Sequence, residues 1–438
     1  MNAKSSTTLA LAGLMVSCLM TPVWAESPKM KMTTEIPASI KIPDVVETRF
    51  GTLRFEDGFP TEETAQKVYD QLDFQRAVES VILTTPAASL TGFRNGIREY
   101  GPDNETAIIW EERMDSKVQL LTPNTTVVYV FLWLDLKDGP MVVEAPPKVL
   151  GLIDDFWFRY VTDFGMAGPD KGKGGKFLVL PPGYKGDVPK GYFVVPSKTS
   201  GVWVFMRGYL DKNLPKEQAV KKASDNIRNT LKVYPLAKKN NAPEMEFING
   251  TGMEINAVLP NDYSFFEGLH AIIQEEPDSF LGPEKKGLLA NIGIVKGQPL
   301  NPDARMKNIL VDAAAIGNTI ARAISFSPRN PGLYTYGKNS GWYQPIINGN
   351  TTYIEDGSVI NEGRVFYHFG YICVSPAMAT KAAGKGSDYS MGMVDSKGRP
   401  MDGSKTYRLH LPPNIPVKDF WALTLYDTQT RCQLQTDQ

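Results

Sequence analysis

The apolar run from Val127 to Leu136 constrains the fold of this chain more than any other feature. It reads VVYVFLWLDL and lacks the regular polar alternation of a strand that faces water on one side. A strand of this kind has to be covered on both faces. The run therefore predicts a central strand inside a layered structure.

Short strand-like segments follow, with glycine and proline between them. They read MVVEAP, DFWFRYVTDF, KFLVL, YFVVP and VWVFMRGYL, and a second group near the end of the chain reads RVFYHFGYICV, YRLHLPP and FWALTLYD. Strands separated by turns such as Asp138-Gly139-Pro140 are typical of sandwiches and not of alternating β-α units. The predicted fold class is α+β with mostly β structure, in two antiparallel blocks.

Capping residues and helical spacing mark the helices. A helix is expected to begin at Thr61 and to continue toward Ile82, with a second short piece over 90–100. Two further helices are predicted over 215–231 and 302–324, in a layer separate from the β blocks, and Asn301-Pro302-Asp303 is the cap signature of the second. A shorter helix is predicted over 263–274.

These patterns divide the chain into consecutive parts. They are a leader (1–25), a lead segment (26–60), a helix with a β-sandwich (61–212), a helical domain (213–326), a linker (327–350) and a second β domain (351–438).

The leader predicts export. Lys4 supplies a positive start, Leu9 to Met20 form a short apolar core, and Val23-Trp24-Ala25 suits a signal peptidase. Cleavage after Ala25 would release a periplasmic or secreted protein. The alternative is a lipoprotein that begins at a lipidated Cys18.

Composition limits the partners of the mature chain. Lys and Arg number 47 against 48 Asp and Glu, a net charge of −1, so no electrostatic basis for nucleic-acid binding is expected. No later stretch is expected to span a membrane. No metal or cofactor is predicted, and a homo-oligomer is left open. Cys373 and Cys432 could form a disulfide or remain buried thiols.

Several long segments resemble a known bacterial family of paired domains of unknown function. TPNTTVVYVFLWLDLKDGPMVVEAPP and GKFLVLPPGYKGDVPKGYFVVPSKT are similar to the domain numbered twelve fifty-four, and DYSMGMVDSKGRPMDGSKTYRLHLPPNIPVKDFWALTLYD is similar to its companion, numbered twelve fourteen. The resemblance implies an immunoglobulin-like sandwich, a helical insert and a C-terminal jelly roll. It also implies that closing strands of the jelly roll are missing, which predicts an exposed apolar patch near Trp421 or Cys373. The family name implies no activity.

Two pairs of residues are candidates for catalysis. Glu267 and His270 lie one turn apart on a predicted helix and could face a polar substrate, or form an ordinary surface pair. Arg364 and His368 share one face of a predicted strand, which could line a pocket or face water. If the two pairs act together, His270 and His368 should line one pocket, and a structure can test this expectation.

A second strand face offers candidates for ligand binding. Trp157, Arg159 and Asp163 alternate along it, and Asp163 could hold Arg159 for recognition of an anion. The alternative is an ion pair on the sheet surface.

Three functions remain open. The first hypothesis is an envelope protein that binds a small molecule or glycan between the sandwich and the helical domain, because such ligands favour domain junctions. A periplasmic hydrolase that uses polar residues at the same junction is the second, and a structural or assembly protein is the third.

Overall fold

The computed structural model describes residues 31–436 except 338–339, 380–387, 416 and 418–420. The chain divides into two compact units. The first ends at Lys67 and the second begins at Val68. The predicted leader, with Cys18 and Ala25, lies outside the described residues.

The first unit is a small antiparallel sheet followed by the start of a helix. Its strands are β1 (Val45–Thr48), β2 (Gly51–Glu56) and β3 (Phe59–Pro60). Helix α1 (Glu62–Arg98) begins immediately afterwards. Thr61 caps this helix as predicted, since its Oγ1 accepts a hydrogen bond from the Thr64 backbone N–H at 3.3 Å.

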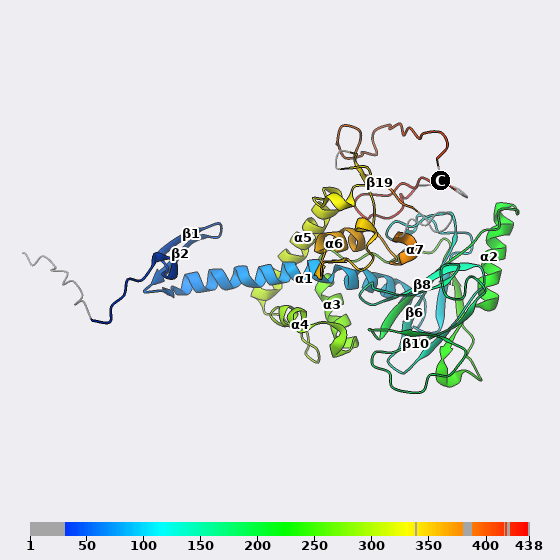
Figure 1. Cartoon of the computed structure of the whole chain (residues 1–438), viewed down its shortest axis with the longest axis horizontal. Helices are drawn as coiled ribbons and strands as arrows, with labels where there is room; N and C mark the ends of the chain where they lie inside the picture. Colours follow the sequence, from blue (N-terminus) through cyan, green and yellow to red (C-terminus); the bar gives the residue numbers. More distant parts are fainter. Residues whose placement is uncertain (1–30, 338–339, 380–387, 416, 418–420, 437–438) are drawn as a thin grey trace, which may run out of the picture. The chain divides into compact units, whose positions relative to one another are not determined.

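The second unit contains a sandwich of two sheets (Figure 1). A 6-stranded sheet has the order β14-β4-β6-β12-β8-β9, and a 4-stranded sheet has the order β11-β10-β7-β13. The strands are β4 (Thr106–Ile109), β6 (Val128–Asp135), β7 (Met141–Ala145), β8 (Val149–Asp155), β9 (Tyr160–Gly165), β10 (Gly175–Leu180), β11 (Phe193–Pro196), β12 (Gly201–Gly208), β13 (Lys232–Pro235) and β14 (Glu246–Asn249). Most neighbours are antiparallel, whereas β10–β11 and β4–β14 are parallel.

Strand β6 occupies the central position that its apolar run predicts, between β4 and β12. Val130 and Leu132 point into the core shared by the two sheets. Phe131 and Trp133 point the other way, into a second core that the sheet forms with helices. Both faces of the strand are covered, which explains why it carries no polar face.

The remaining short strands form two-stranded pairs. These are β5 (Val118–Gln119) with β15 (Ile255–Asn256), β16 (Trp342–Tyr343) with β19 (Met391–Gly392), and β17 (Ile354–Glu355) with β18 (Ser358–Val359).

Helices cover the outer face of the 6-stranded sheet. They include α1, α3 (Ser264–Glu275), α4 (Pro283–Ala290), α5 (Ala304–Phe326), α6 (Asn361–Gly370) and α7 (Pro376–Ala379). The ring of Phe93 on α1 lies 6.0 Å from Phe131 and 5.0 Å from Trp203 between centroids, so α1 packs directly on β6 and β12. Asp303 caps α5 as predicted, accepting from Met306 N at 2.7 Å.

Helix α5 is also the one helix in the described ranges that is long and apolar enough to span a membrane, and 33% of its apolar window is buried. A core helix has the same composition, and Leu310, Ala313 and Ala314 of α5 lie in the core beside α1.

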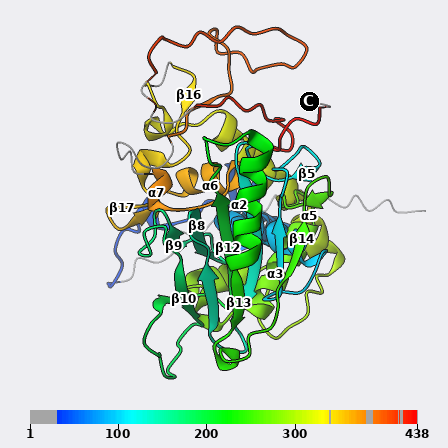
Figure 2. The same cartoon turned by 90° about the vertical axis from the view of Figure 1, so that its right-hand side faces the viewer.

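Helix α2 (Lys216–Thr230) departs from the prediction of one separate helical layer. Its apolar stripe of Val220, Ala223 and Ile227 completes the core between the two sheets. Figure 2 shows α2 lying along β12, and Figure 1 shows it on the opposite side of the strands from α5 and α6. The helices therefore occupy two different positions around the sandwich.

Helix α1 is longer than predicted, because it continues through Pro86 to Arg98. A proline inside a helix removes one hydrogen bond and usually ends or bends the helix. The residues that follow, including Ala87, Leu90 and Phe93, are fully buried against the sheet. Their packing outweighs the local preference for a break.

The predicted C-terminal jelly roll is not confirmed. The predicted strand over 364–374 is wrong for its first part, since residues 361–370 form helix α6, and the described residues of 407–413 and 421–425 lie outside strands. The predicted apolar patch occurs at Trp421, whose side chain is 56% exposed, but not at Cys373, which is 0% exposed. Cys373 and Cys432 are both buried free thiols.

Candidate functional site

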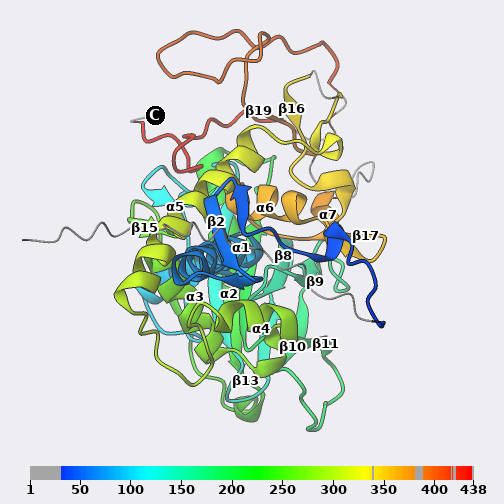
Figure 3. The same ribbon diagram turned by 90° about the vertical axis from the view of Figure 1, so that its left-hand side faces the viewer.

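A buried polar cluster joins the sandwich to the segment around α6. Figures 2 and 3 show α6 and α7 next to strands β8 and β9. Asp154 and Asp163 come from those strands, and Tyr353, Arg364 and His368 come from the C-terminal segment. All five are buried, between 0% and 7% exposed, which is rare for ionisable side chains without a function or a full set of partners.

The turn between β8 and β9 is organised by Asp155. Its carboxylate accepts hydrogen bonds from the backbone N–H groups of Trp157 and Arg159 at 2.8 and 3.1 Å and from Arg159 Nε at 2.7 Å. Phe158 in this turn has a φ of 54°, a left-handed conformation that non-glycine residues rarely adopt.

This turn corrects the predicted strand face. Trp157 and Arg159 lie in the turn and only Asp163 lies in a strand, so the three do not alternate along one strand. Arg159 pairs with Asp155 and not with Asp163. The prediction failed because one strand-like segment contains both a strand end and the turn after it, which periodicity alone does not separate.

Asp154 and Asp163 hold the chain that follows α6. Asp154 Oδ2 accepts from the Val374 backbone N–H at 2.9 Å, and Asp163 accepts from Ser375 Oγ at 2.8 and 3.0 Å. Burial raises the pKa of both carboxyl groups, that of Asp154 well above its ordinary value. This shift favours the protonated form of Asp154, which can donate a hydrogen bond as well as accept one.

Arg364 and His368 lie on helix α6 and not on a strand, which corrects the second predicted face. A buried helix and a buried strand both read as apolar runs, so the pattern did not separate them. The two residues nevertheless share a face, because four residues make about one helical turn. Arg364 Nη2 donates to Asn361 Oδ1 at 3.0 Å, and burial lowers the pKa of His368 well below its ordinary value, which leaves it neutral.

Several polar atoms of the cluster lack partners. Asp154 Oδ1, Tyr353 OH, Arg364 Nε and His368 Nδ1 are buried and make no hydrogen bond to any described residue. The Tyr353 and His368 rings meet edge to face, 5.4 Å apart, and the Phe158 ring lies 5.1 Å from His368. Unpaired buried polar atoms are uncommon in native proteins, so a group of them is a reason to suspect a function.

Asp154 and Tyr353 were not predicted as site residues from the sequence. Asp154 stands at the end of β8 and would have been noticed only as a charged residue in an otherwise apolar strand. No local signal marks Tyr353 within its polar surroundings.

Glu267 and His270 lie elsewhere, on helix α3. Glu267 is exposed, while His270 Nε2 is 2.8 Å from the Gln298 carbonyl and 3.0 Å from Gln274 Nε2. These contacts tie α3 to the following loop. His270 and His368 have separate surroundings, so the prediction of one pocket lined by both histidines gains no support. Within the described ranges no group of His, Cys, Asp and Glu could hold a metal ion.

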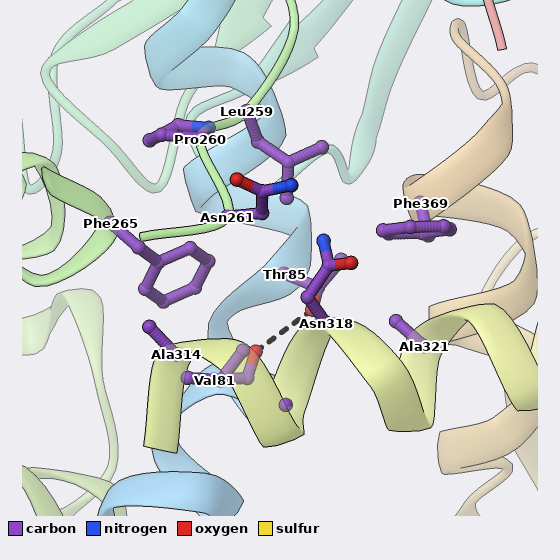
Figure 4. A pocket seen from close by; sticks show the side chains of 11 residues that line it. Val81, Thr85, Leu259, Pro260, Asn261, Phe265, Ala314, Asn318, Ala321 and Phe369 are labelled. Atoms are coloured by element: carbon purple, nitrogen blue, oxygen red, sulfur yellow. Dashed lines mark hydrogen bonds between the residues drawn. The ribbon is translucent and has the colours of Figure 1, made fainter. Parts of the chain in front are cut away.

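A small pocket lies between α1, α5 and α6 but is not part of this cluster (Figure 4). Its volume is about 10 Å³, which is room for a single water molecule. Thr85 in its wall already donates to the Val81 carbonyl at 2.8 Å. The pocket is too small and too apolar to be the binding site of an organic ligand.

The protein is therefore of the α+β class, with a buried polar cluster where its sandwich meets the C-terminal segment around α6. Two family models match this chain. Protein of unknown function (DUF1254) matches residues 105–235, and Protein of unknown function (DUF1214) matches residues 386–438. The chain therefore carries this pair of domains, in the order that its sequence motifs indicate.

A solved structure supports the fold. The chain is similar to the VPA0106 protein from Vibrio parahaemolyticus, with 15% identity over 83% of this chain and 82% of that chain and a TM-score of 0.51. No curated protein matches the chain.

Proposed function

We propose that this protein binds a small polar molecule, of the size and character of a sugar, at the buried cluster around Asp154 and Tyr353. The observation that carries the proposal is the set of unpaired atoms on Asp154, Tyr353, Arg364 and His368. They come from separate segments, and leaving each of them unpaired costs about 1–3 kcal/mol.

The chemistry of the cluster favours a ligand with hydroxyl groups. A protonated Asp154 and the Tyr353 hydroxyl can each donate or accept, Arg364 Nε can only donate, and a hydroxyl-bearing ligand can serve all of these. The Phe158 and Tyr353 rings add apolar surface of the kind that covers a sugar ring. The cluster is closed by the chain around Val374, so a ligand enters through local opening of this segment.

The test compares Tyr353→Phe with Tyr336→Phe. Tyr353 is 3% exposed and Tyr336 is 74% exposed, so the second variant is a surface control. We expect calorimetric titration with D-glucose, D-glucuronate and glucose 6-phosphate to detect binding of at least one by the wild type. Y353F should weaken that binding about tenfold or more, which is a loss of about 1.4 kcal/mol.

The stability of the free protein provides the second readout. Because Y353F removes a buried hydroxyl without a partner, we expect its free energy of unfolding to be unchanged or about 1 kcal/mol higher. A Y353F variant that unfolds more easily and binds as tightly as the wild type would show that the hydroxyl serves the fold. Absence of binding of all three compounds would overturn the proposal.

A further inference from the structure

Three basic side chains lie near enough for their charges to interact at the edge of the cluster, and one of them lies over the Trp157 ring. Arg159 comes from the turn between β8 and β9, Lys285 from α4 and Arg364 from α6. Lys285 Nζ lies 4.9 Å from the centroid of the Trp157 ring. Burial and the positive charges of Arg364 and Arg159 lower the pKa of Lys285 to about 8.

Of these three side chains only Arg159 forms an ion pair within the described ranges, and that pair leaves part of its guanidinium group unused. Arg159 pairs with Asp155 through Nε, but its Nη2 is buried without a partner among the described residues. Arg364 donates only to neutral oxygens, at 3.0 and 3.5 Å, and Glu79, the carboxylate whose charge acts on it, is exposed. Lys285 forms no ion pair within the described ranges.

We infer that the bound molecule is acidic, and that Lys285, Arg159 and Arg364 hold its carboxylate or phosphate group beside Trp157. An oxyanion accepts hydrogen bonds from the free Arg159 Nη2 and Arg364 Nε and offsets the repulsion among the three cations. The inference rests on the proposed function and adds the chemical class of the ligand. An acidic sugar fits both the aromatic rings and the basic side chains. Its ring would lie near Tyr353 and Phe158, and its charged group would lie near Lys285.

The experiment compares the affinity for D-glucuronate, glucose 6-phosphate and D-glucose in wild type, Lys285→Met and Lys286→Met. Lys286 is the exposed neighbour of Lys285 on α4 and serves as the matched control. We expect the wild type to bind at least one of the two acids about tenfold more tightly than glucose, with an advantage that shrinks at higher salt. K285M should lose most of that advantage, whereas K286M should keep it.

The two acids distinguish a carboxylate from a phosphate, and a chemical readout checks the position of Lys285. Acetylation by acetic anhydride at pH 8 should modify Lys285 in the free protein, and the bound acid should slow this reaction about tenfold or more without slowing reaction at Lys286.

Each outcome has a distinct meaning. Equal affinity for glucose and both acids, unchanged in K285M, would overturn the inference while leaving the proposed binding site in place. If none of the three compounds binds, the inference and the proposed function both fail.

Discussion

Burial determines the chemistry of individual acidic residues in this protein. Glu276, which follows α3, accepts hydrogen bonds from the backbone N–H groups of Ser200 and Gly201 at 2.6 and 2.8 Å. Those bonds stabilise its charged form, yet burial has the larger effect and raises its pKa from 4.5 to about 7. Glu276 therefore gains a proton in the folded protein at a pH where the unfolded chain has lost it.

This difference predicts how stability depends on pH. Because the folded state binds the proton more tightly, Glu276 stabilises the protein most below about pH 4.5, and this contribution falls as the pH rises to about 7. The lost contribution amounts to at most about 3 kcal/mol. Urea unfolding between pH 4.5 and 8 should show a steeper decline in the wild type than in Glu276→Gln, because only the wild type carries the contribution of Glu276.

His368 acts in the opposite direction, since a lowered histidine pKa reduces stability as the pH falls below about 6.5. Comparing the wild type with E276Q cancels the contributions of His368, Asp154 and Asp163, which both proteins share. Glu284→Gln, at an exposed position on α4, is the control and should follow the wild type. Parallel curves for the wild type and E276Q would mean that Glu276 stays charged in the folded protein.

At the scale of elements, close packing explains how α1 and α5 meet. Gly317 of α5 leaves no room for a side chain, since a Cβ atom there would lie 2.6 Å from Val81 Cγ1 of α1. Small residues at such a crossing allow two helices to approach closely. Because the protein interior is densely packed, a larger side chain at this position strains the surrounding structure.

Gly317→Ala is therefore expected to destabilise the protein by about 1–3 kcal/mol, since the added methyl group overpacks the crossing. Gly287→Ala on α4 is the matched control, because a Cβ atom there would have nothing within 4 Å. G287A should raise the free energy of unfolding by about 0.5–1 kcal/mol through helix propensity. Chemical denaturation measures both, and a G317A protein as stable as G287A would show that the helices can separate without loss.

For the whole molecule, we propose export and removal of the leader. An apolar core from Leu9 to Met20, followed by Val23-Trp24-Ala25, is typical of a cleaved secretory signal.

Expression of the full sequence in a bacterial host should give a mature protein that begins at Glu26 and leaves the cell on osmotic shock. Mass spectrometry of the purified protein checks this N-terminus. A chain that begins at Cys18 with the mass of a diacylglycerol would replace the prediction with a lipoprotein.

The sequence alone determined the elements whose signals are local. The apolar run at 127–136, the cap at Asp303 and the stripe along 215–231 each report the environment of one segment, and β6, α5 and α2 formed where they predicted. Such signals work because alternation and helical spacing depend only on which sides of a single element are buried.

Only the tertiary structure decided the polar cluster. Asp154 and Val374 lie 220 residues apart, and no local sequence pattern near either residue predicts their hydrogen bond. The same holds for α6, where a run buried on every side has no periodicity to separate helix from strand, and for α1, where packing against the sheet overrides Pro86. Free energy gained by contacts between distant segments decided these features, and that energy leaves no local pattern in the chain.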